Sequence, residues 1–141
     1  MNMFSWQSPR PLRVSAAAVL VALAGCASIG DQTPEQQVER RAGAYWKARA
    51  SADLKTAYSL LTPAYRSINS EEQFGKQFGV GAALTDTGIE KVTCETEDRC
   101  TARIKISAKP AVPGLNLPTV TSYMDETWLR QEGQWWRFQA P

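Results

Sequence analysis

The hydrophobic pattern of this chain changes its period once, near residue 83, and that change limits the possible folds more than any other feature. Before it, apolar side chains recur at the spacing of one helical face, as in the series Val38, Ala42, Tyr45 and Trp46. After it, apolar and polar residues alternate, most clearly from Ala102 to Ala108, which predicts a half-buried antiparallel strand. Helices followed by strands predict an α+β domain with the helices on one face of an antiparallel sheet of four or five strands.

Capping residues and chain breakers set the expected ends of these elements. Thr33, Pro34 and Gln36 have the spacing of a capping box with proline in the first helical turn. Pro63 ends the second helix, because a proline disfavours helical backbone at the residue before it. The expected helices cover about residues 34–50, 54–61 and 70–78, with an extra turn at 64–68. The expected strands cover about residues 89–94, 101–108, 120–131 and 134–139.

The N-terminal segment has the organisation of a secretory leader. Arg10 and Arg13 supply positive charge, an apolar alanine-rich run follows from Val14 to Leu23, and small residues come next. The apolar run is about ten residues long, whereas a helix that spans a bilayer needs roughly 20. We therefore expect a removable leader here rather than a permanent transmembrane anchor.

The four residues Leu23-Ala24-Gly25-Cys26 resemble the lipobox of bacterial lipoproteins, in which a peptidase cuts just before a lipidated cysteine. The resemblance implies a signal peptide at residues 1–25, a lipidated tether at 26–32 and a single mature domain at 33–141. In lipoproteins of diderm bacteria an aspartate after the cysteine retains the protein at the inner membrane. Ala27 stands there in this chain, which favours the outer membrane, with the domain facing the periplasm. The alternative is an ordinary secretory leader with an incidental cysteine.

Removal of that leader leaves a mature domain without net charge. The whole chain has 16 Lys and Arg against 14 Asp and Glu, and residues 1–25 contain two of the basic residues and none of the acidic ones. A neutral domain has no basic footprint for nucleic acid, so we expect no nucleic-acid partner. The chain also lacks histidine, a glycine-rich phosphate loop and a cluster of metal ligands, so we expect no cofactor and no metal.

Cys94 and Cys100 remain as an even pair once Cys26 is acylated. They flank the polar turn Glu95 to Arg99 between two expected strands. Disulfides persist in the oxidising compartments that exported proteins reach. The sequence therefore predicts a Cys94–Cys100 disulfide across a β-hairpin. A zinc site or a redox motif is the weaker interpretation, because the spacing is not CxxC and two thiolates alone do not make a tetrahedral site.

Three stretches of the chain resemble the nuclear transport factor two-like superfamily, also called SnoaL-like or ketosteroid-isomerase-like: Ala44 to Arg66, Ser70 to Gly79 and Glu126 to Phe138. The resemblance implies a cone, in which a strongly curved sheet wraps around the first helix and leaves an opening that binds ligands in many members. It also implies possible homodimerisation or partner contact through the exposed face of the sheet. The superfamily contains enzymes, binding modules and proteins without known activity, so the fold alone does not give a function.

Asp125 and Glu126 are the candidate acid or base groups of such a cone. A tyrosine would be the hydrogen-bond donor beside them, with Tyr45, Tyr58 and Tyr123 as candidates. Neighbouring residues of a strand point to opposite faces, so only one of the two carboxylates can face the interior, and the strand register needed to choose between them is open at this point. A structural or solvated carboxylate is the favoured interpretation, and catalysis is the alternative.

The aromatic side chains allow two interpretations. Five of them could line a hydrophobic cavity, namely Tyr45, Trp46, Trp128, Trp136 and Phe138. A domain of this size also needs large side chains to fill its core, which is the favoured interpretation. Trp135 and Trp136 must point to opposite faces, and an exposed Trp135 would mark a contact surface.

These features together predict a lipid-anchored envelope protein that faces the periplasm and acts as a binding or structural module. One alternative is a small-molecule carrier or an acid/base enzyme that uses the cone as its pocket. The other is an accessory subunit of an envelope complex.

Overall fold

The computed structural model describes residues 32–78, 82–110 and 112–140, and it confirms the order of helices followed by strands. The leader, the tether and Cys26 lie outside the described residues. The elements are α1 (Pro34–Ala50), α2 (Leu54–Ser59), α3 (Pro63–Ile68), α4 (Glu71–Phe78), β1 (Ala82–Thr96), β2 (Arg99–Pro110), β3 (Val120–Gln131) and β4 (Gln134–Arg137). The strands form one antiparallel sheet in the order β1-β2-β3-β4.

The start of α1 is fixed by the capping box that the sequence predicts. The Thr33 hydroxyl accepts a hydrogen bond from the backbone N–H of Gln36, and the Gln36 side chain accepts one from the backbone N–H of Thr33. Asp53 caps α2 and Thr62 caps α3, each through a side chain that accepts one hydrogen bond from a backbone N–H. The capping box explains why α1 begins at the predicted residue.

The strand β1 is longer than predicted, because it begins at Ala82 rather than near residue 89. Its register with β2 shifts between Leu84 and Asp86, between Ile89 and Lys91, and between Cys94 and Thr96. Each bulge interrupts the period-two alternation that identifies a strand in a sequence. Bulges at an edge strand also hinder pairing with another chain, so they protect this border of the sheet.

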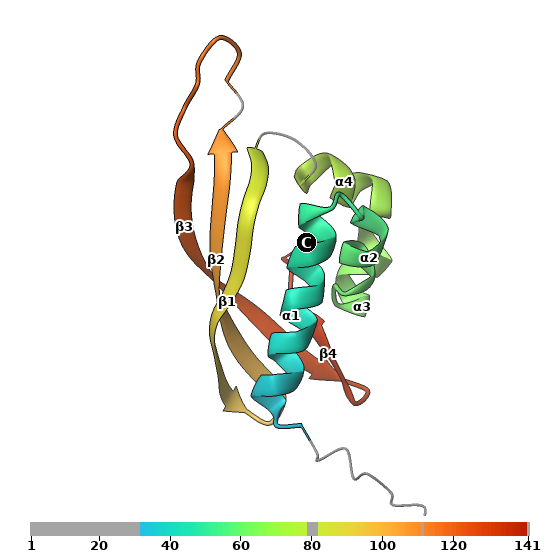
Figure 1. Ribbon diagram of the computed structural model, residues 1–141. Helices are drawn as coiled ribbons and strands as arrows, with labels where there is room; N and C mark the ends of the chain where they lie inside the picture. The colour runs from blue at the N-terminus through green and yellow to red at the C-terminus, as the bar shows by residue number, and fades with distance from the viewer. Residues whose placement is uncertain (1–31, 79–81, 111, 141) are drawn as a thin grey trace, which may run out of the picture.

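The helix α1 lies against the concave side of the curved sheet, as the predicted cone requires (Figure 1). Its buried face consists of Val38, Ala42, Tyr45, Trp46 and Ala48. The sheet contributes the other part of the same core through Cys100, Ala102, Ile104, Trp128 and Trp135. The core therefore occupies the interior of the cone. No helix within the described ranges is long and apolar enough to cross a membrane.

The short strand β4 pairs with β3 on one edge and with the link between α2 and α3 on the other edge. Residues Glu132 and Gly133 have positive φ values of 53° and 75°, which are typical of the tight turn that joins β3 to β4. On the other edge Leu61 forms an isolated parallel bridge with Arg137. The backbone N–H of Thr62 donates to the Arg137 carbonyl at 3.0 Å, and the N–H of Arg137 donates to the Leu60 carbonyl at 2.9 Å. The link between α2 and α3 thus fixes the position of Arg137.

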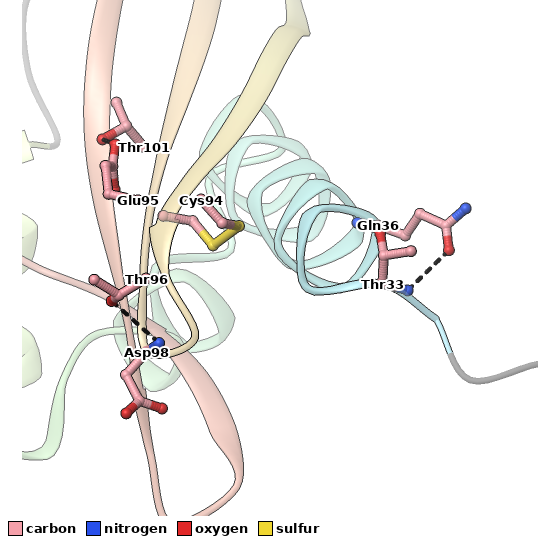
Figure 2. The surroundings of a disulfide bond; sticks show 8 residues. Thr33, Gln36, Cys94, Glu95, Thr96, Asp98 and Thr101 are labelled. Atoms are coloured by element: carbon pink, nitrogen blue, oxygen red, sulfur yellow. Dashed lines mark hydrogen bonds between the residues drawn. A yellow bond between two sulfur atoms is a disulfide. The ribbon is translucent and has the colours of Figure 1, made fainter.

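The predicted disulfide between Cys94 and Cys100 is confirmed. The two residues lie directly opposite each other in the β1–β2 hairpin, and Cys100 belongs to the buried core. Figure 2 shows the sulfur atoms on the side of the hairpin that faces the first turn of α1, where Thr33 and Gln36 lie. Closing so short a loop restricts the unfolded chain and stabilises the fold by about 2 kcal/mol.

Candidate functional site

The interior of the cone contains a buried ion pair between β3 and β4. The Arg137 Nε donates to Glu126 Oε1 at 2.7 Å, and the side chains are 8% and 1% exposed. The Arg137 Nη1 also donates to Gln139 Oε1 at 2.7 Å, and its guanidinium lies 4.6 Å from the ring centroid of Tyr45. Buried charges are tolerated when they are paired in this way, so the pair is enclosed and largely satisfied.

One oxygen of this carboxylate has no partner. Glu126 Oε2 is buried and makes no hydrogen bond with a described residue. The indole N–H groups of Trp46, Trp128 and Trp135 are also buried and unbonded. Such groups are uncommon in protein interiors, and each carries a desolvation cost. The interior of the cone is therefore more polar than its aromatic composition indicates.

Three tyrosines of the helical layer are held by hydrogen bonds. The Tyr45 hydroxyl accepts from Arg49 Nη1 at 3.0 Å, and the Tyr58 hydroxyl donates to the Asn69 carbonyl at 2.6 Å. The Tyr65 hydroxyl lies 3.1 Å from Gln77 Oε1 and donates to it. Burial raises the pKa of Tyr65, the neighbouring Tyr45 and Tyr58 raise it further, and the charge of Arg137 opposes the change. Tyr65 is consequently a neutral donor at ordinary pH.

The structure resolves which carboxylate faces inward. Glu126 points into the cone, whereas the Asp125 side chain is 56% exposed and pairs with Arg103 at 3.5 Å on the outer face. Tyr123 is exposed on that outer face as well, so the proposed pairing of an inward acid with Tyr123 is wrong. Because facing residues of β3 and β4 share a side, Arg137 and not Tyr123 is the neighbour of the inward carboxylate.

The aromatic candidates separate into two groups. Tyr45, Trp46 and Trp128 are buried and pack together in the core. Phe138 is 46% exposed, and Trp136 is partly exposed. The exposed Trp135 that would have marked a contact surface is not found, because Trp135 is 2% exposed. Its register opposite Arg130 places Trp135 on the inner side of β4.

A groove lies at the end of α1 and beside the first half of β1. Its volume is about 440 Å³, and its lining consists of Lys47, Ala50, Ser51, Leu84, Thr85, Asp86 and Thr87. None of the aromatic candidates lines it, and neither does Glu126. The Asp86 carboxylate is 3.3 Å from the Lys105 ammonium group, so its charge is partly compensated. Within the described residues no three Cys, Asp or Glu side chains gather as a metal site would require.

Sequence reasoning missed Arg137, Tyr65 and the groove. Strand alternation could have identified Arg137, because it lies two residues after Trp135 and therefore shares a face of β4 with it. Tyr65 lies in the helix that begins after Thr62 with Pro63. This local pattern predicts the helix, but it does not show that Tyr65 is buried. The groove joins α1 to β1, segments whose proximity no local pattern encodes.

Comparison with known proteins gives the fold. No family model matches the chain, and no curated protein matches it. A solved SEC-C motif containing protein from Psychrobacter arcticus is 9% identical, with a TM-score of 0.59 over 74% of this chain and 60% of that one. A SEC-C motif containing protein from Rhodopseudomonas palustris is 12% identical, with a TM-score of 0.53 over 67% of this chain and 69% of that one.

A ketosteroid isomerase-like protein from Erwinia carotovora atroseptica is also similar. It is 15% identical, with a TM-score of 0.51 over 72% of this chain and 88% of that chain. Identities this low concern the fold and not the activity. The helices, the curved antiparallel sheet and this likeness together confirm the nuclear transport factor two-like fold.

Proposed function

We propose that this nuclear transport factor two-like domain is a lipid-anchored envelope module that faces the periplasm and acts by binding or structural contact. The observation that carries the non-catalytic part is the enclosure of Glu126. A general base must come within hydrogen-bond reach of the proton that it removes. Glu126 is the inward carboxylate, its side chain is 1% exposed, and Arg137 already occupies one of its oxygens.

The proposed location in the cell envelope has separate support. The lipobox at Leu23 to Cys26 supports an anchor, and Ala27 supports the outer membrane. The Cys94–Cys100 disulfide supports an oxidising compartment, because disulfides are rare in reducing ones.

The groove favours a second candidate function, binding of a small molecule. Its volume of about 440 Å³ is enough for a small ligand, but the groove is widely open to solvent and would leave much of that ligand exposed. The lining combines the apolar Ala50 and Leu84 with the charged Lys47 and Asp86, so it offers both contact area and orientation. In this candidate the ligand occupies the border of the cone and not its interior.

Exposed apolar side chains favour a third candidate, an accessory subunit. Seven large hydrophobic side chains of the described residues are exposed, and five of them lie between residues 112 and 124: Val112, Leu115, Val120, Tyr123 and Met124. They belong to β3 and to the connection before it, at the end of the sheet away from the start of α1 (Figure 1). Val120 and Met124 lie on one face of β3 and Tyr123 lies on the other, so this end of the strand exposes apolar side chains on both faces. Exposed apolar area is typical of protein contacts.

The anchor is tested by fractionation and intact mass of the full chain expressed in a diderm bacterium. Wild-type protein is expected in the membrane fraction, with the mass of a chain that begins at Cys26 and carries acyl groups. Cys26→Ser is expected without the acyl mass and with residues 1–25 still attached, because the peptidase cuts only before a lipidated cysteine. Ser28→Ala, two residues away, is the control and should behave as the wild type. Membrane association of Cys26→Ser with an unchanged mass would refute the anchor.

A further inference from the structure

The first half of β3 forms an open edge of the sheet. On one side β2 pairs with this half of the strand without a break. On the other side β4 pairs with β3 only from Trp128 onward, and the Phe138 N–H donates to the Thr127 carbonyl at 2.8 Å. No described strand pairs with residues 120–126 on that side, and we call this stretch the open edge. Figure 1 shows it at the border of the sheet away from the helices.

Every second residue of the open edge turns its backbone N–H and C=O groups away from β2. The Thr127 carbonyl accepts from Phe138 on that side, and the register between β2 and β3 continues from there to the start of β3 without a shift. Backbone groups along a strand point alternately to its two edges. The N–H and C=O groups of Asp125, Tyr123 and Thr121 therefore face the open edge. None of them has a backbone partner there among the described residues.

The open edge lacks the features by which proteins protect their edge strands. The strand β1, at the other border, is interrupted by register shifts, whereas the register between β2 and β3 is continuous. The open edge contains no proline and no lysine, and the charge of Asp125 is paired with Arg103 on the outer face. Its side chains from Val120 to Asp125 are all exposed, and apolar ones lie on both faces. An unprotected edge of this kind is a template for pairing with another strand.

We propose that the open edge pairs with the same edge of a second copy of the chain, in antiparallel orientation, so that two subunits share one continuous sheet. A twofold pair that uses the whole open edge is centred on its middle residue, Tyr123. Tyr123 then lies opposite the partner's Tyr123, and Thr121 lies opposite the partner's Asp125. All of these residues turn their N–H and C=O groups toward the edge, so each opposite pair exchanges two hydrogen bonds. The family resemblance implies contact through the face of the sheet, whereas this contact uses its edge.

The side chains of the open edge complement themselves in this register, which identifies a second copy as the occupant. On the outer face the two Tyr123 rings become cross-strand neighbours, a favourable type of pair. On the inner face Met124 lies opposite the partner's Ser122 and diagonal to the partner's Met124 and Val120. The pairing thus gathers Met124 and Val120, which are 38% and 51% exposed in the single chain. Asp125 lies opposite the hydroxyl-bearing Thr121 and not opposite a second carboxylate, so no like charges oppose each other.

The register is tested by cysteine cross-linking of the full chain. Tyr123→Cys places two thiols opposite each other at the twofold axis, where the Cα atoms of a hydrogen-bonded pair are about 5.5 Å apart, a distance that a disulfide spans. We expect a covalent dimer on a non-reducing gel after mild oxidation, above the background that the wild type gives through Cys26. Lys105→Cys is the matched control, because Lys105 lies opposite Tyr123 on β2 and its copy in the partner is three strand spacings away, or roughly 14 Å. Absence of the Tyr123→Cys dimer, or equal linking through Lys105→Cys, would overturn the edge pairing.

The backbone contribution is tested by sedimentation velocity of the full chain in detergent, over a range of concentrations. The wild type is expected to show a concentration-dependent dimer. Thr121→Pro removes an N–H that faces the open edge and keeps the bonds with β2, so it should weaken the dimer about tenfold or more. Thr121→Ser keeps both the N–H and the hydroxyl and should change the affinity less than about threefold.

The outcomes of sedimentation separate this proposal from the anchor at Cys26. A wild type that stays a monomer at every concentration, or a Thr121→Pro variant that dimerises as the wild type does, would overturn the pairing with a second copy. If Thr121→Pro does not fold, the Tyr123→Cys cross-link still decides. A wild type without acyl groups on Cys26 that nevertheless dimerises would refute the anchor and leave the edge pairing standing.

Discussion

Replacement of Glu126 by glutamine is expected to lower the free energy of unfolding by about 3–5 kcal/mol. The substitution keeps the shape of the side chain but leaves the Arg137 guanidinium buried without its counter-charge. A buried charge that has lost its partner is costly because neither water nor another ion compensates it. Urea denaturation of the wild type and of Glu126→Gln gives this difference directly, provided that the free energy of unfolding falls with the same slope against urea concentration in both.

The neighbouring residue provides the control for this experiment. Asp125 pairs with Arg103 at 3.5 Å, but both side chains are more than half exposed. Asp125→Asn should therefore change stability by about 1 kcal/mol or less. The double variant Glu126→Leu with Arg137→Met removes both buried charges and should recover most of the stability lost in Glu126→Gln. A loss in Glu126→Gln no larger than that in Asp125→Asn would mean that the cone is open to water.

Replacement of Trp128 by alanine is expected to lower the free energy of unfolding by about 3–5 kcal/mol. Trp128 is completely buried and belongs to the core cluster, so the substitution leaves a cavity that the surroundings only partly fill. Phe138→Ala is the matched control, because Phe138 is 46% exposed and its removal leaves no comparable cavity. Its effect should stay within about 1 kcal/mol.

The cavity in the Trp128→Ala variant can also be detected by the binding of a small ligand. A cavity with the shape of the lost indole ring can bind a small aromatic molecule. Added indole should raise the melting temperature of Trp128→Ala and leave that of the wild type unchanged, since ligand binding to the native state stabilises it. If Trp128→Ala retained nearly full stability, Trp128 would line an open pocket and the core-filling account would fail.

Local patterns predicted much of the fold. The bounds of α1 were predictable because Thr33, Pro34 and Gln36 make a complete start signal within four residues. The cystine hairpin was predictable because both cysteines belong to one turn and its two strands. In each case the determining contacts lie close together in the sequence.

Features that depend on pairing between distant segments were not predictable in this way. The first half of β1 lacked a strand signal because its bulges interrupt the alternation. Alternation limited the inward carboxylate to Asp125 or Glu126, but the choice needed the position of Arg137 on β4. The open edge of β3 is defined only once β2 and β4 are placed on either side of that strand.

The enclosure of Glu126 is tested most directly by labelling carboxyl groups on the folded protein. Carbodiimide coupling of glycine ethyl ester, located by fragmentation mass spectrometry, compares Glu126 with its neighbour Asp125, whose side chains are 1% and 56% exposed. The account predicts that Asp125 is labelled in the folded protein and that Glu126 is labelled only after unfolding. Labelling of Glu126 at the rate of Asp125 in the folded protein would contradict the enclosure of Glu126. The interior of the cone would then be accessible to a small reagent, and therefore to a substrate.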